Sequence, residues 1–106
     1  MSIKIRGAND EKIASLADRL ARYELRHPRA EIQILRKNVA SIHVRIVDPD
    51  FEGIDRADRH DAAWEFIAEL PESVQCSVSV LLLLTPDEAT NSFASSEFDP
   101  PMARPA

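Results

Sequence analysis

The hydrophobic pattern of this chain changes its period after His27-Pro28, and that change limits the folds open to it. Before this point apolar residues recur at helical spacing, which predicts an amphipathic helix over 11–26 with Asp10 as its N-cap. The proline ends the helix, because the residue before a proline is disfavoured in the helical conformation. Apolar residues then alternate, at 32 and 34 and again at 42, 44 and 46, which predicts two strands joined as an antiparallel hairpin.

The second half of the chain repeats the change from helix to strand. Apolar residues at helical spacing predict a helix over about 56–70, ended by Pro71. Residues 77–84 then predict a third strand, whose second half is apolar on both faces and is therefore expected to be covered from two sides. Thr85-Pro86-Asp87-Glu88 is typical of a helix start, with threonine as N-cap, proline at the first position and glutamate closing a capping box.

The expected order is α-β-β-α-β-α, in a single small α+β domain. About thirty residues containing a helix separate the second and third strands, which favours a right-handed crossover and parallel pairing. We therefore expect a mixed three-stranded sheet with its helices packed on one face, formed by residues 1–92. The Pro- and Ser-containing segment 93–106 is expected to be a flexible tail.

The other face of such a sheet has few helices to cover it. Leu35 and two of the residues Leu81–Leu84 are then expected to be exposed there. Exposed apolar side chains of this kind indicate a protein partner or a homodimer.

Composition excludes several classes of protein. The chain has 106 residues and one cysteine, so it has no internal disulfide and no Cys-only metal cluster. Its longest apolar run, Val80–Leu84, is far shorter than the ~20 residues of a membrane span. The polar N-terminus does not resemble a signal peptide. These features predict a cytoplasmic protein with no membrane partner.

Charge is divided unevenly along the chain, whose formal net charge is −5. Residues 1–47 hold ten Lys or Arg against five Asp or Glu, whereas residues 48–106 hold three against thirteen. An acidic protein is disfavoured as a nucleic-acid binder, because phosphate contacts supply most non-specific affinity. The basic half still offers a candidate patch, made of Arg19, Arg22, Arg26, Arg36, Lys37 and Arg45. Such charges more often form solvated faces paired with acidic residues.

Motifs typical of catalytic or metal-binding sites are scarce in this sequence. The sequence has no Walker loop, zinc-protease motif or nucleophile elbow, so we expect no enzyme and no catalytic residue. Cys76 has no local base and is expected to be a buried, structural thiol. Asp48 to Gly53 looks like the opening of a calcium loop, but its twelfth position is Arg59 instead of glutamate, which favours a turn with an acidic rim.

The stretch after the hairpin is the most distinctive in the chain. Gly53 is expected to take a positive φ, and Phe51 to anchor the loop on the core. A strand is followed by F-x-G, a short spacer and R-H, and then by a helix, an apolar strand and T-P-[DE]-E. This order resembles the BolA family, whose fold is similar to the type II KH arrangement. The matching residues are Phe51, Gly53, Arg59, His60 and Thr85-Pro86-Asp87-Glu88.

The resemblance implies a small non-enzymatic binding or regulatory protein with no cofactor of its own. Members of that family pair with monothiol glutaredoxins, and the histidine of the R-H motif can ligate a shared [2Fe–2S] cluster. Carried over to this chain, His60 becomes the candidate iron ligand, and Phe51, Gly53, Arg59 and His60 mark the partner surface. Imidazole is a known ligand of such iron.

The chain departs from the family's pattern at one ligand. The family often supplies a second Cys or His from the loop between the hairpin strands, but here that loop is Arg36–Ala40 and His43 falls on the strand. The G-x-x-G loop of KH domains is absent, which excludes RNA binding by that mode. Two alternatives stay open: a self-associating interaction domain without a cofactor, and a weak nucleic-acid-binding regulator.

Overall fold

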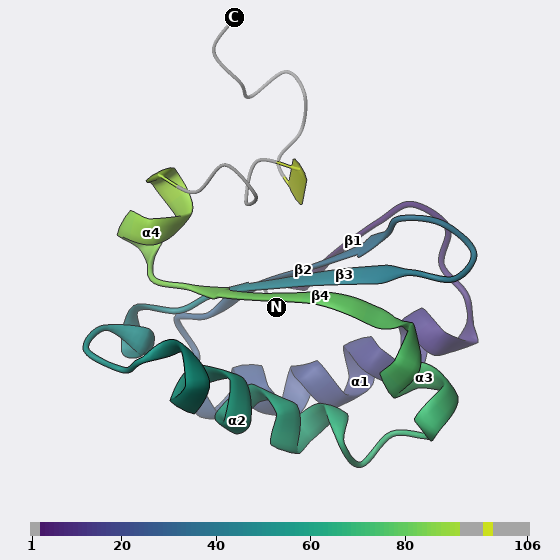
Figure 1. Ribbon diagram of the computed structural model, residues 1–106, viewed down its shortest axis with the longest axis horizontal. Helices are drawn as coiled ribbons and strands as arrows, with labels where there is room; N and C mark the ends of the chain where they lie inside the picture. The colour runs from purple at the N-terminus through teal and green to yellow at the C-terminus, as the bar shows by residue number, and fades with distance from the viewer. Residues whose placement is uncertain (1–2, 92–96, 99–106) are drawn as a thin grey trace, which may run out of the picture.

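Four strands form one mixed sheet in the computed structural model, which describes residues 3–91 together with 97 and 98 (Figure 1). The strands are β1 (Ile3–Arg6), β2 (Glu31–Arg36), β3 (Ile42–Val47) and β4 (Val78–Leu84), and they lie side by side in chain order. The helices are α1 (Glu11–Arg26), α2 (Arg56–Ile67), α3 (Glu72–Ser77) and α4 (Pro86–Asn91), and a 3₁₀ turn, η1 (Pro49–Phe51), follows β3.

The sheet consists of two β-α-β units joined by a hairpin. β1 and β2 are parallel and connected by α1, while β3 and β4 are parallel and connected through α2 and α3. β2 and β3 are antiparallel, with Ile34 opposite Val44 at the centre. The predicted hairpin and the predicted parallel pairing after the second long helix are both confirmed.

Local signals place the helix ends where the sequence predicts them. The Asp10 carboxylate accepts the Ile13 N–H at 3.0 Å and caps α1. Thr85 and Glu88 form the predicted capping box, in which each side chain accepts the other residue's backbone N–H, at 3.2 and 2.9 Å respectively. A proline at the first position of α4 needs no hydrogen-bond partner for its nitrogen.

The expectation of three strands and one long second helix is wrong. β1 adds a fourth strand, which pairs with β2 from Ile3 opposite Ile32 to Arg6 opposite Leu35. The second helix ends at Ile67, and α3 follows Pro71 as a separate short helix. Both additions are too short to give a periodic signal of their own.

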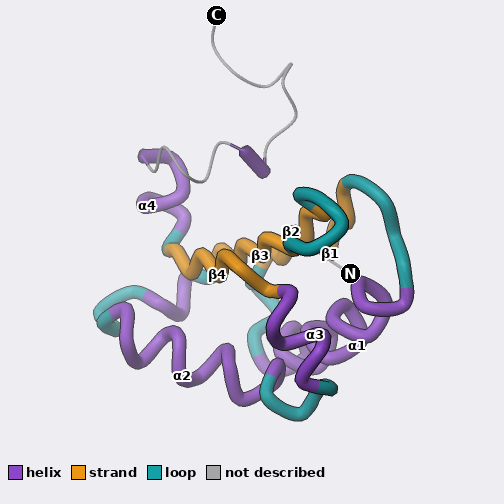
Figure 2. The backbone as a smooth tube through the Cα atoms, turned by 45° about the vertical axis from the view of Figure 1, so that its right-hand side comes forward, coloured by secondary structure: helices purple, strands orange, loops and turns teal. Residues whose placement is uncertain are grey.

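The core lies between the sheet and the layer of α1, α2 and α3 (Figure 2). Its members are apolar side chains from both β-α-β units and include Ile13, Leu16, Leu20, Tyr23, Ile32, Ile34, Ile42, Val44, Ile46, Phe51, Ala63, Ile67 and Leu83. Figures 1 and 2 show α4 on the other side of the sheet, so the prediction that the helices pack on one face is wrong for this helix. A hollow bordered by Glu31, Arg45 and Val47 on the strands and by Pro86, Ala89 and Thr90 of α4 confirms that position.

The far side of the sheet is less open than expected. On this side, Leu35 and Leu82 are half-buried and Leu84 is buried, whereas Leu81 and Leu83 face the core. Most of the segment expected to be a flexible tail, 93–96 and 99–106, lies outside the described residues. Glu97 and Phe98 are described, and both contact the sheet. Among the described helices, none has the length and apolar character needed to cross a membrane.

Candidate functional site

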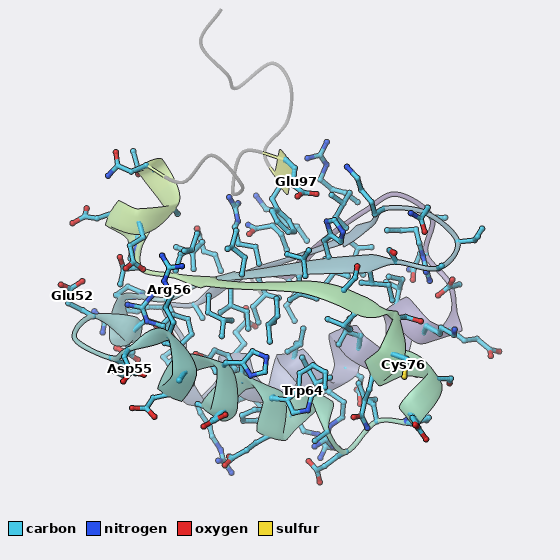
Figure 3. The ribbon with its side chains drawn as sticks, in the orientation of Figure 1. Glu52, Asp55, Arg56, Trp64, Cys76 and Glu97 are labelled. Carbon is cyan, nitrogen blue, oxygen red and sulfur yellow. The ribbon has the colours of Figure 1, made fainter. Side chains whose placement is uncertain are left out.

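A groove runs between α2 and β4, and we call it the α2–β4 groove. It has a volume of about 180 Å³ and is lined by Arg56, His60 and Leu81–Leu84. Arg56, His60 and Trp64 are spaced four residues apart, so they lie on one face of α2 (Figure 3 labels the first and last). The imidazole of His60 is exposed and stacks on the indole of Trp64, with ring centroids 5.7 Å apart.

The floor of this groove is the edge of the sheet. β4 is the last strand in the order, so one side of its backbone faces away from β3. Leu84 O accepts the Asp48 N–H at 2.9 Å and therefore faces β3, so the alternation of a strand turns the backbone of Leu81 and Leu83 outward. Sequence reasoning identified His60 but missed Arg56, Trp64 and this strand edge, although the spacing of four residues was a readable signal.

Arg59, predicted to mark the partner surface, is buried. Its Nε donates to Ile54 O at 2.7 Å, and its Nη1 donates to Leu83 O at 3.1 Å. The same guanidinium forms an ion pair with Glu88, at 2.5 Å for the nearer oxygen, and lies 5.5 Å from the centre of the Phe51 ring. Arg59 therefore fastens α2 to β4 and α4 and is not available to a partner.

Glu88 is the carboxylate that compensates this buried charge. The hydrogen bond from Arg59, followed by the bond from the Thr85 backbone, lowers the pKa of Glu88 to about 2. Glu88 is therefore ionised at neutral pH and is shared between the capping box and the ion pair. The T-P-D-E segment thus has a structural role in this chain.

Of the remaining motif residues, Phe51 is buried and Gly53 is exposed. Phe51 is 3% exposed and belongs to the core, as predicted for a residue anchoring its loop. Gly53 has a φ of +80°, which L side chains rarely adopt, as the sequence predicted. Within the R-H motif, the exposed side chain is therefore that of His60.

A second cluster of polar groups joins the end of α1 to the β3–η1 turn. His27 Nδ1 lies 3.3 Å from Asp48 Oδ2 and 3.2 Å from Asp50 Oδ2. These three residues are placed as metal ligands would be, within 4.8 Å of one another. Their oxygens are, however, already engaged: Tyr23 O–H donates to Asp48 at 2.8 Å, and Arg29 to Asp50 at 2.5 Å. The arrangement is a hydrogen-bonded cluster, consistent with the turn predicted for this segment.

The pKa values in this cluster follow from those contacts. Burial, and then the hydrogen bond to Asp48, raises the pKa of Tyr23 far above its usual range, so the phenol keeps its proton. Hydrogen bonds from His27 and Arg29 lower the pKa of the Asp50 carboxyl. The cluster therefore holds ionised Asp50 and neutral Tyr23 at neutral pH.

The six cations of the candidate basic patch do not gather on one surface. Arg19 bonds Phe66 O at 3.2 Å and pairs with Glu69, while the Arg26 guanidinium lies 5.8 Å from the centre of the Phe66 ring. Arg22 lies on α1 and is exposed. Arg36 pairs with Asp10, Lys37 with Glu97 at 3.8 Å, and Arg45 is buried beside Gln33. They are divided among α1, the hairpin and the far side of the sheet.

Two further predictions concern Cys76 and His43. Cys76 is exposed on α3, so the expectation that its thiol is buried is wrong. His43 lies on the sheet side opposite the helices, where Nδ1 is 2.8 Å from Glu97 Oε1. The described part of the chain therefore brings no second cysteine or histidine to the α2–β4 groove.

Comparison of the chain with protein-family models, with curated proteins and with solved structures finds no match in any of the three.

Proposed function

We propose that this protein is a non-enzymatic binding domain that docks a protein partner against the α2–β4 groove. The observation that carries the proposal is the exposed His60 imidazole at the rim of a groove that runs along the outer edge of β4, where Arg59 already bonds the backbone oxygen of Leu83. An apolar strand edge beside a helix accepts an extended backbone, and residues on the helix then select the partner.

His60 is also the residue that would ligate iron in the BolA-like version of this function. The imidazole is exposed and fits a [2Fe–2S] cluster as one ligand. The groove lacks a second cysteine or histidine in the described residues, so the other ligands belong to the partner, which the resemblance names as a monothiol glutaredoxin. Trp64 restricts the imidazole by stacking on one of its faces.

The test is anaerobic co-expression with a monothiol glutaredoxin and comparison of His60→Ala with His60→Cys. We expect a coloured complex with wild type, loss of its visible spectrum with His60→Ala, and a shifted spectrum with His60→Cys, which restores a ligand. His43→Ala is the matched control, because it removes a histidine from the opposite side of the sheet. Equal spectra for wild type and His60→Ala would contradict a ligand role.

Docking and iron ligation are separable in the same experiment. Arg56→Glu leaves the imidazole in place but reverses a charge on the groove wall, so it is expected to weaken complex formation. A partner that binds wild type and Arg56→Glu equally would contradict the docking site, whatever the colour of the complex.

A second candidate function follows from the same strand edge. Val80–Leu84 is an uncharged apolar run on an edge strand, and such edges pair readily with another strand. Pairing at Leu83 would have to displace the Arg59 guanidinium from the Leu83 oxygen. Pairing of β4 with β4 of a second copy would give a homodimer without a cofactor. Light scattering of the purified chain alone distinguishes the two, because the first proposal predicts a monomer and the second a dimer.

A further inference from the structure

The side of the sheet away from α1, α2 and α3 carries three rows of side chains. Glu31, Val47 and Leu84 form the row beside α4, and we call the other two rows the outer sheet face. Strand register places Lys4, Gln33, Arg45 and Leu82 in one row, and Arg6, Leu35, His43 and Val80 in the next. These eight residues include three permanent cations and a histidine, but no carboxylate. The outer sheet face therefore combines positive charge with apolar surface.

Glu97 binds the charged part of this face. Its Oε1 lies 2.8 Å from His43 Nδ1 and 3.8 Å from Lys37 Nζ, and its backbone oxygen accepts from Arg6 at 3.3 Å. Figure 3 shows Glu97 on the side of the sheet opposite Trp64 and Cys76. One glutamate residue thus contacts three basic side chains, from β1, β3 and the hairpin loop.

Phe98 is buried beside Arg45 of this face. It is 2% exposed, and the Arg45 guanidinium lies 5.3 Å from the centre of its ring. Arg45 is itself 6% exposed and donates from Nε to Gln33 Oε1 at 2.8 Å, which orients the guanidinium. A guanidinium that is held in place on a sheet in this way is positioned for a cation–π contact with an aromatic ring.

We propose that the outer sheet face is a recognition site for a short acidic–aromatic peptide of a partner protein, and that Glu97-Phe98, which forms a 3₁₀ turn, occupies this site in cis. Charge complementarity supports this partner, because the face offers basic groups from several strands and the chain's own segment meets them with one carboxylate and one ring. The chain's own Glu97-Phe98 segment therefore indicates which chemistry the outer sheet face accepts. A partner peptide must displace this segment.

The tether sets how strongly the chain's own segment competes. Five residues separate Asn91 from Glu97. A short tether holds its segment at an effective concentration on the order of 1 mM. A peptide that binds the free face with a Kd of about 100 μM would therefore bind the wild-type chain about ten-fold more weakly.

The experiment uses the full chain and a fluorescein-labelled peptide of sequence 94–101, with binding followed by fluorescence anisotropy. The chain carrying both Glu97→Ala and Phe98→Ala exposes the face and is expected to bind the peptide about ten-fold more tightly than wild type. Adding Lys4→Glu or His43→Ala to that chain is expected to weaken binding again. A control peptide with Glu97→Lys and Phe98→Ala is expected not to bind.

Amide NMR spectra show whether each variant is folded and where the peptide binds. Shifts confined to β1, β2 and β3 of the exposed-face variant support the proposal. A folded exposed-face variant that does not bind the peptide overturns it, as does equal binding by wild type. Wild-type dimers that dissociate on Phe98→Ala would assign the face to a second copy of this chain and also overturn it.

Discussion

The guanidinium of Arg59 contacts four parts of the molecule, namely the loop at Ile54, the Phe51 ring, the β4 backbone at Leu83, and Glu88 on α4. A buried arginine is tolerated where its donors are satisfied and its charge is balanced. The carboxylate that balances it, Glu88, is 40% exposed, so solvent weakens the ion pair. The pair therefore fixes geometry more than it adds stability.

Glu88 makes the stability of this region depend on pH. Its folded pKa of about 2 lies below its ordinary value of 4.5, so its contribution is complete above about pH 4.5 and is lost as the pH falls towards 2. We expect Glu88→Gln to lower the free energy of unfolding at pH 7 by about 1 kcal/mol. Urea unfolding of both proteins from pH 7 to 2 checks this: the difference should shrink with acid, and a constant difference would contradict it.

Tyr23 gives a second prediction at a single residue. Its hydroxyl donates to the fully buried Asp48, whose other oxygen accepts from the Asp50 N–H. Tyr23→Phe removes that donor without creating a large cavity and leaves a buried carboxylate short of a partner. We expect a loss of about 1–3 kcal/mol in urea unfolding. A loss below about 0.5 kcal/mol would show that water replaces the hydroxyl.

At the scale of elements, two glycines at loop positions differ in what surrounds them. Both have positive φ, but a Cβ at Gly7 would lie 2.9 Å from the backbone oxygen of Arg36, whereas a Cβ at Gly53 would meet no heavy atom within 4 Å. Gly53→Ala therefore costs only the backbone strain, about 1 kcal/mol. Gly7→Ala should cost more, about 2 kcal/mol or above, because β1 must also shift from β2. Thermal unfolding of both variants checks the order, which equal losses would contradict.

The sequence predicted the elements that have a clear period or cap, including the short helix α4, and missed β1 and α3. The helix over 11–26 and the hairpin have clear periods and local caps, so they could be found without tertiary information. β1 has two apolar residues in four and exists because its backbone pairs with β2, a contact across the whole of α1. α3 has no side-chain cap and contributes Val74 to the core. β1 and α3 depend on tertiary pairing and packing, which the local sequence does not show.

The candidate site was predicted to the same extent. His60 was found from a short motif, and it is exposed at the groove. Arg59 belongs to the same motif but is buried, because Glu88 and Leu83 are brought to it by the fold. Which of the two adjacent residues, Arg59 or His60, faces solvent depends on partners more than twenty positions away, and local sequence does not show them.

At the scale of the whole molecule, the two β-α-β units share one core. Ile13 and Leu16 of the first unit and Ile67 and Leu83 of the second belong to the same buried cluster. A shared core favours one cooperative transition. We expect urea unfolding followed by far-UV circular dichroism and by the fluorescence of Trp64 to give the same midpoint. Separate midpoints would mean that the second unit, which holds Trp64, unfolds independently.

The connections of the sheet also set the order in which it can assemble. The β2–β3 hairpin closes a short loop, whereas β1 and β4 reach their neighbours only after a helical crossover, and closing a longer loop costs more chain entropy. Folding is therefore expected to start at the central hairpin and to add the two edge strands later. The α2–β4 groove, which needs β4 in place, is completed late, so a partner meets its docking surface only on a chain that has almost finished folding.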